Sequence, residues 1–529
     1  MYTLFENGWI HSKPQASALL VRDGRIAALG EREELLTLCK GEKCVSQDLE
    51  GNTLLPAFLD GHSHLSQYAQ SLQFADAASC RSFEELLETL KRFAKENSLA
   101  PGQWLCAMGY DPERLVQGRH PDRNMLDQLK GYPVLLTAAS GHLGVMNSLA
   151  LEKAGITAET PDPSGGRIGR NESGQLTGYL EENAFFKAAA AIPPLTMEQK
   201  LENLVKAQQI YASYGITTAQ EGLMHPGDLE LLEKADRENR LMLEVVGYAD
   251  LREHDLFPWQ TPDFGVEKGG NFRVGGYKLF LDGSPQGRTA WLTRPYTPKE
   301  GETPGYRGYP AYPTEQVRAY VELAHGENRQ LLTHCNGDAA IDQLLSVYEE
   351  PCVTRDVIVH AQTIRVDQLP KVRTLHLIPS YFVAHVYRYG EIHLLQLGEQ
   401  RAEKISPLAS TQALGIPFTL HQDTPVMPPD MLHTLYCATC RKTEKGRLLG
   451  GEERISMEQA LQAVTFHAAY QYFEERRKGS LRVGMDADLT IVSGNLLGDD
   501  PAASQEKQVL ETWRAGKPIY QRASPSSSH

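Results

Sequence analysis

Several features are scarce in this sequence of 529 residues, and each scarcity excludes a class of protein. Eight cysteines are too few for a disulfide scaffold. Cys437 and Cys440 form one Cys-x-x-Cys pair, which we expect to lie on a helix as small apolar residues, with a redox or metal role as the alternative. No run of 18 apolar residues occurs, so we expect no membrane-spanning helix. The N-terminus lacks the basic and apolar regions of a signal peptide, which favours a cytoplasmic protein.

Positive charge is also in short supply. The chain has 53 Lys and Arg against 67 Asp and Glu, a formal net charge of -14. A nucleic-acid-binding protein needs clustered positive charge against phosphate, so we expect a small-molecule partner and no nucleic acid. A hydrophobic fraction of 41% rules out wholesale disorder. The length suits one large domain with a smaller unit.

The two ends of the chain have the same pattern of short strands and turns. Residues 19–29 place apolar runs on either side of Asp23-Gly24, a hairpin sequence, and residues 488–494 and 512–520 are also strand-like. We therefore predict a small β-sandwich domain that is built from both termini, residues 1–54 and 476–522. The Ser-rich tail, residues 523–529, is predicted to be disordered.

Between these ends, strand-like runs alternate with amphipathic segments such as residues 314–328, 339–350 and 366–374. This alternation predicts an α/β fold, a (β/α)8 TIM barrel over residues 55–475. An inserted subdomain is expected at about residues 66–200, after the first strand, with a hairpin flap over the barrel mouth. The eight predicted strands are Ala57–His62, Ile216–Glu221, Leu243–Tyr248, Val274–Phe280, Leu331–His334, Val357–His360, Ile378–Phe382 and Pro417–Asp423.

Ionisable residues fall late in these strands, at the ends that open onto the catalytic face of a barrel. We expect six of them to converge on a metal site: His62, His64, Lys278, His334, His360 and Asp423. Residues two apart in extended backbone point to the same side, so both imidazoles of the His-x-His pair can reach one ion. Imidazole suits zinc, with manganese or iron as alternatives.

Each of these residues also has a plainer interpretation. His334 and His360, taken singly, could be buried structural histidines. Lys278, if desolvated, can take up carbon dioxide to become an N6-carboxylated lysine that bridges two ions. Its alternatives are a structural lysine paired with Asp282 and a catalytic amine. Asp423 could bind metal and exchange a proton with water, or it could cap a helix.

Motifs along nearly the whole chain resemble those of the amidohydrolase superfamily, in the branch of N-substituted formamide deformylase. They are LPAFLDGHSH at 55–64, VMNSLA at 145–150, GITT at 215–218, YKLFLDGS at 277–284, HCNGD at 334–338, VHAQ at 359–362 and GSLRVGMDADL at 479–489. Ala57 replaces the usual glycine, Val359 replaces an acid, and His421-Gln422 precede Asp423 where relatives carry Gly or Ser. None of these departures removes a predicted ligand.

The resemblance implies a metal-dependent hydrolase that cleaves an amide or other non-peptide C–N bond of a small molecule. Two divalent ions would be bound, metal-bound hydroxide would attack the carbonyl, and Asp423 would act as general base and then acid. Alternatives are action on an ester, lactone or cyclic imide, isomerisation or decarboxylation at the same site, a single-metal enzyme with unmodified Lys278, and a non-catalytic scaffold. A homodimer is also expected from the resemblance.

Four further residues are predicted to contact substrate. His142 lies in the insertion, His385 follows the seventh strand, and Tyr110 could donate a hydrogen bond to an oxyanion. Arg288 could bind a substrate carboxylate or, alternatively, clamp a loop.

Overall fold

The computed structural model describes residues 1–11, 16–257 and 270–523. The predicted tail at 523–529 therefore lies outside the described residues, apart from Ala523. The chain divides into two compact units, each described by itself: Met1–Tyr68 with Leu204–His529, and Ala69–Asn203. The second unit occupies nearly the interval in which an insertion was expected.

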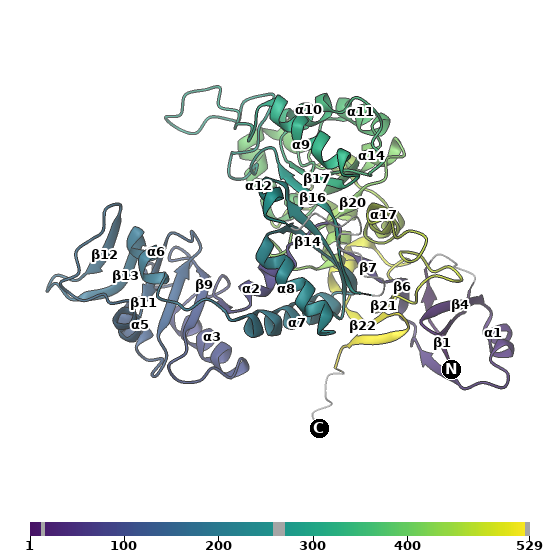
Figure 1. Cartoon of the computed structure of the whole chain (residues 1–529), viewed down its shortest axis with the longest axis horizontal. Coiled ribbons are helices and arrows are strands. Elements are labelled where there is room, and N and C mark those ends of the chain that lie inside the picture. The colour runs from purple at the N-terminus through teal and green to yellow at the C-terminus, as the bar shows by residue number, and fades with distance from the viewer. Residues whose placement is uncertain (12–15, 258–269, 524–529) are drawn as a thin grey trace. The chain divides into compact units, whose positions relative to one another are not determined.

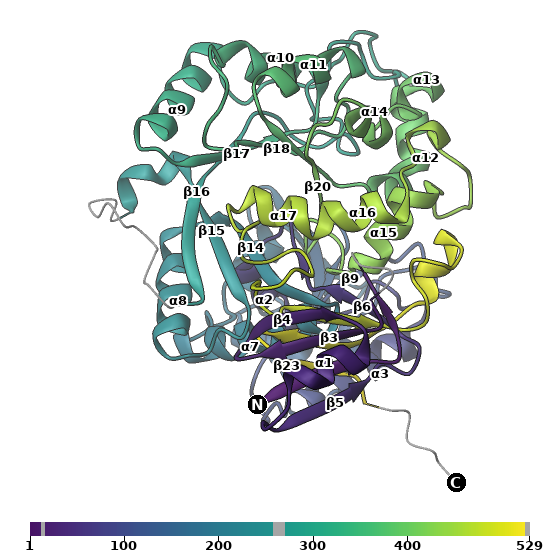
Figure 2. The same cartoon turned by 90° about the vertical axis from the view of Figure 1, so that its right-hand side faces the viewer.

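The first unit contains a curled, eight-stranded parallel sheet in the order β20-β19-β18-β17-β16-β15-β14-β7, which Figure 2 shows from β14 round to β20. All eight predicted strands are present, but the first and last keep only two residues in the ladder. The strands are β7 (Phe58–Leu59), β14 (Ile216–Met224), β15 (Glu244–Asp250), β16 (Phe272–Phe280), β17 (Gln330–Cys335), β18 (Val357–His360), β19 (Ile378–Tyr381) and β20 (Thr419–Leu420).

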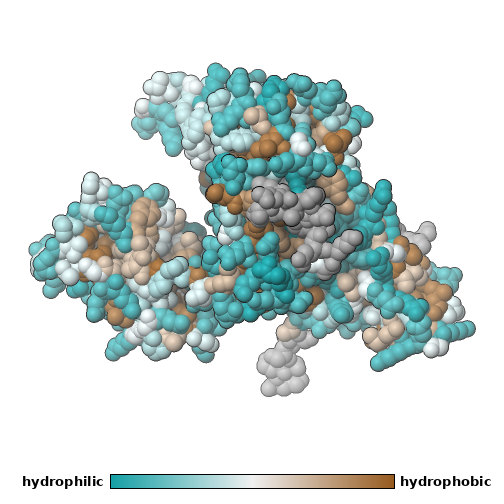
Figure 3. All heavy atoms as spheres, in the orientation of Figure 1, coloured by the Kyte–Doolittle hydropathy of each residue, from teal (hydrophilic) through white to brown (hydrophobic). Residues whose placement is uncertain are grey.

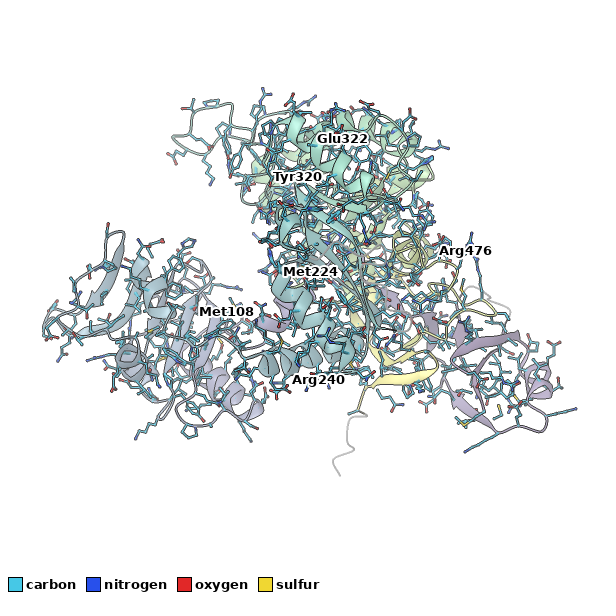
Figure 4. The ribbon with its side chains drawn as sticks, viewed as in Figure 1. Met108, Met224, Arg240, Tyr320, Glu322 and Arg476 are labelled. Atoms are coloured by element: carbon cyan, nitrogen blue, oxygen red, sulfur yellow. The ribbon has the colours of Figure 1, made fainter. Side chains whose placement is uncertain are left out.

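Helices follow most of these strands, as the alternating pattern predicts. Helix α9 (Thr314–Gly326) buries Val317, Val321 and Ala324, a spacing of four and three residues that keeps one side toward the sheet. Tyr320 and Glu322, which Figure 4 labels, lie on this helix. The part of the surface in Figure 3 that contains α9 is mostly hydrophilic. The others are α8 (Pro226–Arg237), η1 (Leu251–Leu256), α10 (Asp338–Val347), α12 (His385–Leu397), α13 (Glu399–Ala402) and α14 (Leu408–Ala413).

The helix predicted at 366–374 is in fact two elements, η2 (Val366–Gln368) and α11 (Leu369–Thr374). Pro370 stands in the first turn of α11, where its missing N–H costs nothing. The remaining helices near the C-terminus are α15 (Met431–Cys440), η3 (Gly451–Glu453), α16 (Met457–Val464), α17 (Phe466–Gln471) and η4 (Pro501–Glu506). Cys437 and Cys440 lie on α15 as free thiols, which agrees with the helical interpretation of this pair.

Strands from both ends of the chain form two further sheets. The four-stranded sheet contains β1 (Tyr2–Glu6), β3 (Ala18–Arg22), β4 (Arg25–Gly30) and β5 (Cys44–Asp48), with α1 (Arg32–Leu38) after β4. The five-stranded sheet contains β2 (Trp9–Ile10), β6 (Thr53–Pro56), β21 (Leu489–Val492), β22 (Val509–Arg514) and β23 (Lys517–Gln521).

The pairing of the two chain ends is direct. Strand β6 pairs antiparallel with β21, and the two strands are labelled next to each other in Figure 1. The rings of Phe5 and Trp513, one from each end, lie 5.1 Å apart in a shared hydrophobic cluster. Asp23 and Gly24 both have positive φ, 50° and 78°, as the predicted β3–β4 hairpin turn requires. The two ends therefore share one core.

The second unit is a six-stranded sheet in the order β12-β13-β11-β10-β9-β8 with helices beside it. Turns at residues 164–165 and 172–173 border the antiparallel pair β12 and β13. Its strands are β8 (Phe74–Asp76), β9 (Leu105–Tyr110), β10 (Val134–Ala138), β11 (Leu143–Met146), β12 (Gly166–Arg170) and β13 (Leu176–Glu182). Its helices are α3 (Phe83–Glu96), α4 (Arg123–Leu126), α5 (Ser148–Lys153) and α6 (Asn183–Ala189), while α2 (Leu65–Ser71) and α7 (Met197–Ser213) lead in and out.

Over the described ranges, none of the helices combines the length and apolar character that crossing a membrane requires.

Candidate metal centre

The curled sheet brings the six predicted ligand residues together at the carboxyl ends of its strands. Lys278, His334 and His360 lie late in β16, β17 and β18, while the other three follow β7 and β20. Asp423 lies at the middle of the group: its Oδ1 is 3.4 Å from His64 Nε2 and 3.5 Å from His62 Nε2, and its Oδ2 is 4.0 Å from His360 Nε2. His62, His64 and Asp423 each offer a ligand atom within 4.8 Å of the others.

Lys278 and His334 complete the cluster from its two sides. Lys278 Nζ lies 3.1 Å from His62 Nε2, and His334 Nδ1 lies 3.0 Å from His360 Nε2. His334 Nε2 lies 3.0 Å from the Gly283 carbonyl oxygen and 3.0 Å from Asn336 Nδ2, so both groups hold the ring in place.

Burial keeps these imidazoles in the neutral form that a metal requires. It lowers the pKa of His62 and His360 well below the usual value, and that of His334 to about 4. Burial also lowers the pKa of Lys278 to about 7, although Asp423 opposes this shift. Burial alone would raise the pKa of Asp423, but His360, His62 and His64 hold it well below its ordinary range.

Two of the six residues have an unusual backbone conformation. His360 has φ of 71° and Asp423 has φ of 54°, both in the left-handed region that non-glycine residues rarely adopt. Such conformations persist where the surroundings hold them, and they concentrate at functional sites. Here they turn two side chains at the points where β18 and the segment after β20 leave the sheet.

Gln220, which we did not predict, fixes the orientation of His62. Its Oε1 accepts from His62 Nδ1 at 2.6 Å, while its Nε2 donates to the Gly61 carbonyl at 3.1 Å and to the Tyr472 hydroxyl at 2.9 Å. The Gly61 carbonyl can only accept, so the amide orientation is determined and His62 Nε2 is left with its lone pair toward Lys278. An isolated Gln in an apolar strand gives no sequence sign of this role.

His421 was noted in the sequence only as a departure before Asp423, yet it belongs to the cluster. Its Nε2 lies 3.2 Å from His360 Nδ1, and its Nδ1 lies 2.8 Å from Ser380 Oγ. Burial lowers its pKa to about 3. It precedes Asp423 by two residues, the same spacing as His62 and His64, and this pattern could have identified it.

Glycine at position 222 makes room for the His62 ring. A Cβ on Gly222 would lie 2.4 Å from His62 Cε1 and 2.8 Å from the Ser63 carbonyl oxygen. The neighbouring Glu221 is buried and accepts from the Ser66 N–H at 2.6 Å, and burial raises its pKa to about 8. The Gln-Glu-Gly segment of β14 therefore supports the His-x-His pair from behind.

The four residues that were predicted to contact substrate have different surroundings in the structure. His385 begins α12, is buried, and lies 3.2 Å from His393 through its Nδ1. The Phe382 ring lies 4.6 Å from that of His385 and 5.6 Å from that of His421. Arg288 donates to the Thr297 carbonyl at 2.8 Å and to Glu302 at 2.6 Å. This is the loop clamp that was the alternative for Arg288, and its guanidinium is committed to it.

Tyr110 and His142 belong to the second unit. The Tyr110 side chain is fully buried and its hydroxyl lies 2.9 Å from His120 Nδ1. His142 is exposed and its Nδ1 lies 3.2 Å from Glu182 Oε2. Their contact with substrate stays a prediction.

The donor set fits a divalent metal. Asp423 Oδ1 is buried and accepts no hydrogen bond, as a carboxylate oxygen kept for a cation would be. Two other groups of described residues have the required proximity, His325 with Cys352 and Asp356, and His225 with Asp250 and Glu253. Asp356 already accepts from Tyr348, Thr354 and Leu331, and Asp250 is paired with Arg252, so both carboxylates are committed within the protein.

A parallel α/β sheet with imidazoles, an amine and a carboxylate gathered at the ends of its strands is the arrangement of a metal-dependent hydrolase. Residues 46–520 match the sequence model of the Amidohydrolase family, and the chain belongs to this family. The protein is a metal-dependent hydrolase of the amidohydrolase type.

Three known proteins resemble the chain over nearly its whole length. YtcJ of Bacillus subtilis (strain 168), an amidohydrolase by name, is 26% identical over 538 residues, 99% of this chain and 98% of YtcJ. N-substituted formamide deformylase of Arthrobacter pascens is 26% identical over 527 residues, 96% of this chain and 95% of the deformylase. The crystal structure of an uncharacterised metal-dependent hydrolase from Pyrococcus furiosus has a TM-score of 0.74 at 26% identity and covers 95% of this chain and 100% of its own.

Proposed function

We propose that this enzyme hydrolyses an amide or another non-peptide C–N bond of a small molecule. The observation that carries the proposal is the buried carboxylate of Asp423, which faces three imidazoles and leaves one oxygen without a hydrogen bond. Similarity to an N-substituted formamide deformylase over 95% of that enzyme supports the choice of a C–N bond.

We further propose two divalent ions, with zinc preferred and manganese or iron as alternatives. His62 and His64 would hold one ion, His334 and His360 the other, and Asp423 and an N6-carboxylated Lys278 would complete the set. When bound, such ions would polarise the scissile carbonyl and lower the pKa of a nearby water.

The chain's own residues account for the proton transfers. The Asp423 carboxylate, ionised because the surrounding imidazoles favour its charge, can accept a proton from the attacking water and later return it to the leaving nitrogen. The amine of Lys278 can form an N–C bond with carbon dioxide, losing one proton to become a carbamate. Burial favours the neutral amine of Lys278, which is the form that adds to carbon dioxide.

Two features of the fold, a closed barrel and a β-sandwich, are also proposed. We infer that the curled sheet closes into a (β/α)8 barrel, because a Cβ on Gly61, after β7, would lie 2.9 Å from Thr419 Oγ1 in β20. We also infer that the two terminal sheets form one β-sandwich, since the cluster that contains Phe5 and Trp513 draws on both.

An activity survey tests the proposal. The protein reconstituted with zinc would be assayed on formamides, N-acyl amino acids, cyclic imides, esters and lactones. We expect turnover of a C–N substrate that falls by about 10²–10⁴-fold in Asp423→Asn. Asp430→Asn is the matched control, because Asp430 caps α15 from the same loop by accepting from His433 N at 3.0 Å. Turnover of esters or lactones alone would contradict the C–N assignment, and equal loss in both variants would contradict the role of Asp423.

A further inference from the structure

A second cavity opens among loops that follow strands β16 to β19. Its volume is about 280 Å³, near the lower end of the range for small-molecule pockets. The walls come from segments 292–294, 363–366 and 397–404, with Asp338 between them. None of the six predicted metal ligands lines this cavity.

The lining is strongly cationic although the whole protein is acidic. Arg294, Arg365, Arg401 and Lys404 face the cavity, whereas Asp338 is the sole carboxylate among its lining residues. Asp338 is fully engaged: Thr293 donates to it from the backbone N–H at 2.9 Å and from the hydroxyl, and Arg365 donates to it at 3.0 Å. Its charge also acts on Arg401, but it is one carboxylate among four cationic side chains in the lining.

Arg365 itself is already paired. Besides Asp338, it donates to Asp342 at 3.0 and 3.2 Å and to Asp367 at 3.1 Å. Three carboxylates therefore compensate its charge, and we assign it a structural role in the cavity wall.

Arg401 and Arg294 are different. The guanidinium of Arg401 donates three hydrogen bonds to backbone carbonyls, those of Leu397 at 2.7 Å, Pro295 at 2.8 Å and Arg294 at 3.1 Å. These bonds fix the guanidinium in place without neutralising it. Arg294 is exposed and forms no ion pair with a described residue. Lys404 contributes a third charge at the rim, with a loose, exposed contact to Glu452 at 3.3 Å.

Apolar side chains complete the lining. Leu292, Ile364 and Leu397 are 3%, 1% and 4% exposed, so the cavity joins an apolar wall to a cationic rim. A guanidinium matches a carboxylate in planar geometry and binds it through paired hydrogen bonds.

We propose that this cavity binds a small organic carboxylate with an apolar body, at a site separate from the metal centre. Arg294 and Arg401 bind the carboxylate, and the wall of Leu292, Ile364 and Leu397 receives the apolar body. The proposal does not depend on which bond the enzyme hydrolyses.

Titration calorimetry with three probes tests the proposal: 4-phenylbutyrate, the neutral 4-phenylbutanamide and inorganic phosphate. We expect 4-phenylbutyrate to bind at least tenfold more tightly than either of the others. We expect Arg294→Gln to weaken it tenfold or more. Arg388→Gln, the matched control, removes an exposed arginine of α12 that pairs with Glu444 at 3.4 Å outside the cavity, and it should leave binding unchanged.

Arg401→Gln should also weaken binding, but its lost carbonyl bonds could loosen the loops, so Arg294→Gln carries the decision. The titration is repeated after the metal is removed with a chelator, and binding within threefold of the metal-loaded value is expected. Loss of binding on metal removal would assign the carboxylate to the metal centre and overturn the proposal. Equal binding of the amide, equal binding of phosphate, or unchanged binding in Arg294→Gln would overturn it as well.

Discussion

Replacement of Gln220 by leucine isolates the role of a residue that touches a metal ligand without being one. The Gln220 side chain is fully buried and bonds to His62, Gly61 and Tyr472. Gln220→Leu removes the acceptor that orients the His62 ring, and such a loss typically weakens metal binding by about 10–100-fold. That range corresponds to about 1.4–2.8 kcal/mol.

Gln471 provides a matched control from the same surroundings. It is equally buried, and its Nε2 donates to the same Gly61 carbonyl at 2.8 Å, but its Oε1 accepts from Thr419 rather than from a histidine. Both Gln220→Leu and Gln471→Leu leave buried polar groups unsatisfied, so each should lower the free energy of unfolding of the metal-free protein by about 1–3 kcal/mol. Only Gln220→Leu should also weaken the binding of zinc.

The assay is competition for zinc between the protein and a fluorescent chelator, with urea unfolding of the metal-free protein measured in parallel. We expect the zinc dissociation constant to rise by at least tenfold in Gln220→Leu and by less than threefold in Gln471→Leu. Equal constants for the two variants would refute the reasoning, because of the two side chains only that of Gln220 bonds to a predicted metal ligand.

Three further predictions concern the site and the stability of the fold. Gly222→Ala should weaken zinc binding at least tenfold, measured by the same competition, because the added Cβ would meet the His62 ring. Glu244→Gln should lower the free energy of unfolding by about 1–3 kcal/mol in urea at pH 7, since a partly buried carboxylate that pairs with Arg477 and Lys478 is lost. Burial alone would raise the pKa of Glu244, but Lys478 and Arg477 lower it, so the wild-type advantage is present above pH 4.5 and declines as the pH falls below it. Asp356 raises the pKa of His325 to about 10, so the contribution of this pair to the free energy of unfolding is complete below pH 6.5 and is lost as the pH rises through 10. Urea unfolding of His325→Gln should not show this pH dependence.

The fold could be predicted from the sequence where periodicity and turn residues act locally. The alternation of apolar strands and amphipathic segments located all eight strands of the curled sheet, and Asp23-Gly24 located a hairpin by its need for positive φ. The short ladders of β7 and β20 could not be predicted, because they depend on where their neighbours in the sheet end. The same is true of α1, a seven-residue helix that the sequence analysis did not identify.

At the site, the predictable residues are those at the ends of strands. Parallel strands deliver such residues to one edge, and the six convergent side chains follow from that rule. Gln220 and Gly222 could not be identified in the same way, because their importance arises from contacts with His62. Gln220 lies 158 residues from His62 in the chain. For Arg288, the sequence allowed either a bond to a substrate carboxylate or a loop clamp. In the structure its guanidinium donates to Glu302 and to the Thr297 carbonyl, so it clamps the loop.

The most direct test of the metal centre is anomalous X-ray diffraction at the zinc edge from crystals of the zinc-loaded protein. We expect a peak within about 2.0–2.2 Å of ligand atoms of His62, His64 and Asp423. A peak at His325, Cys352 and Asp356 with none at the first group would show that the metal centre is assigned to the wrong residues.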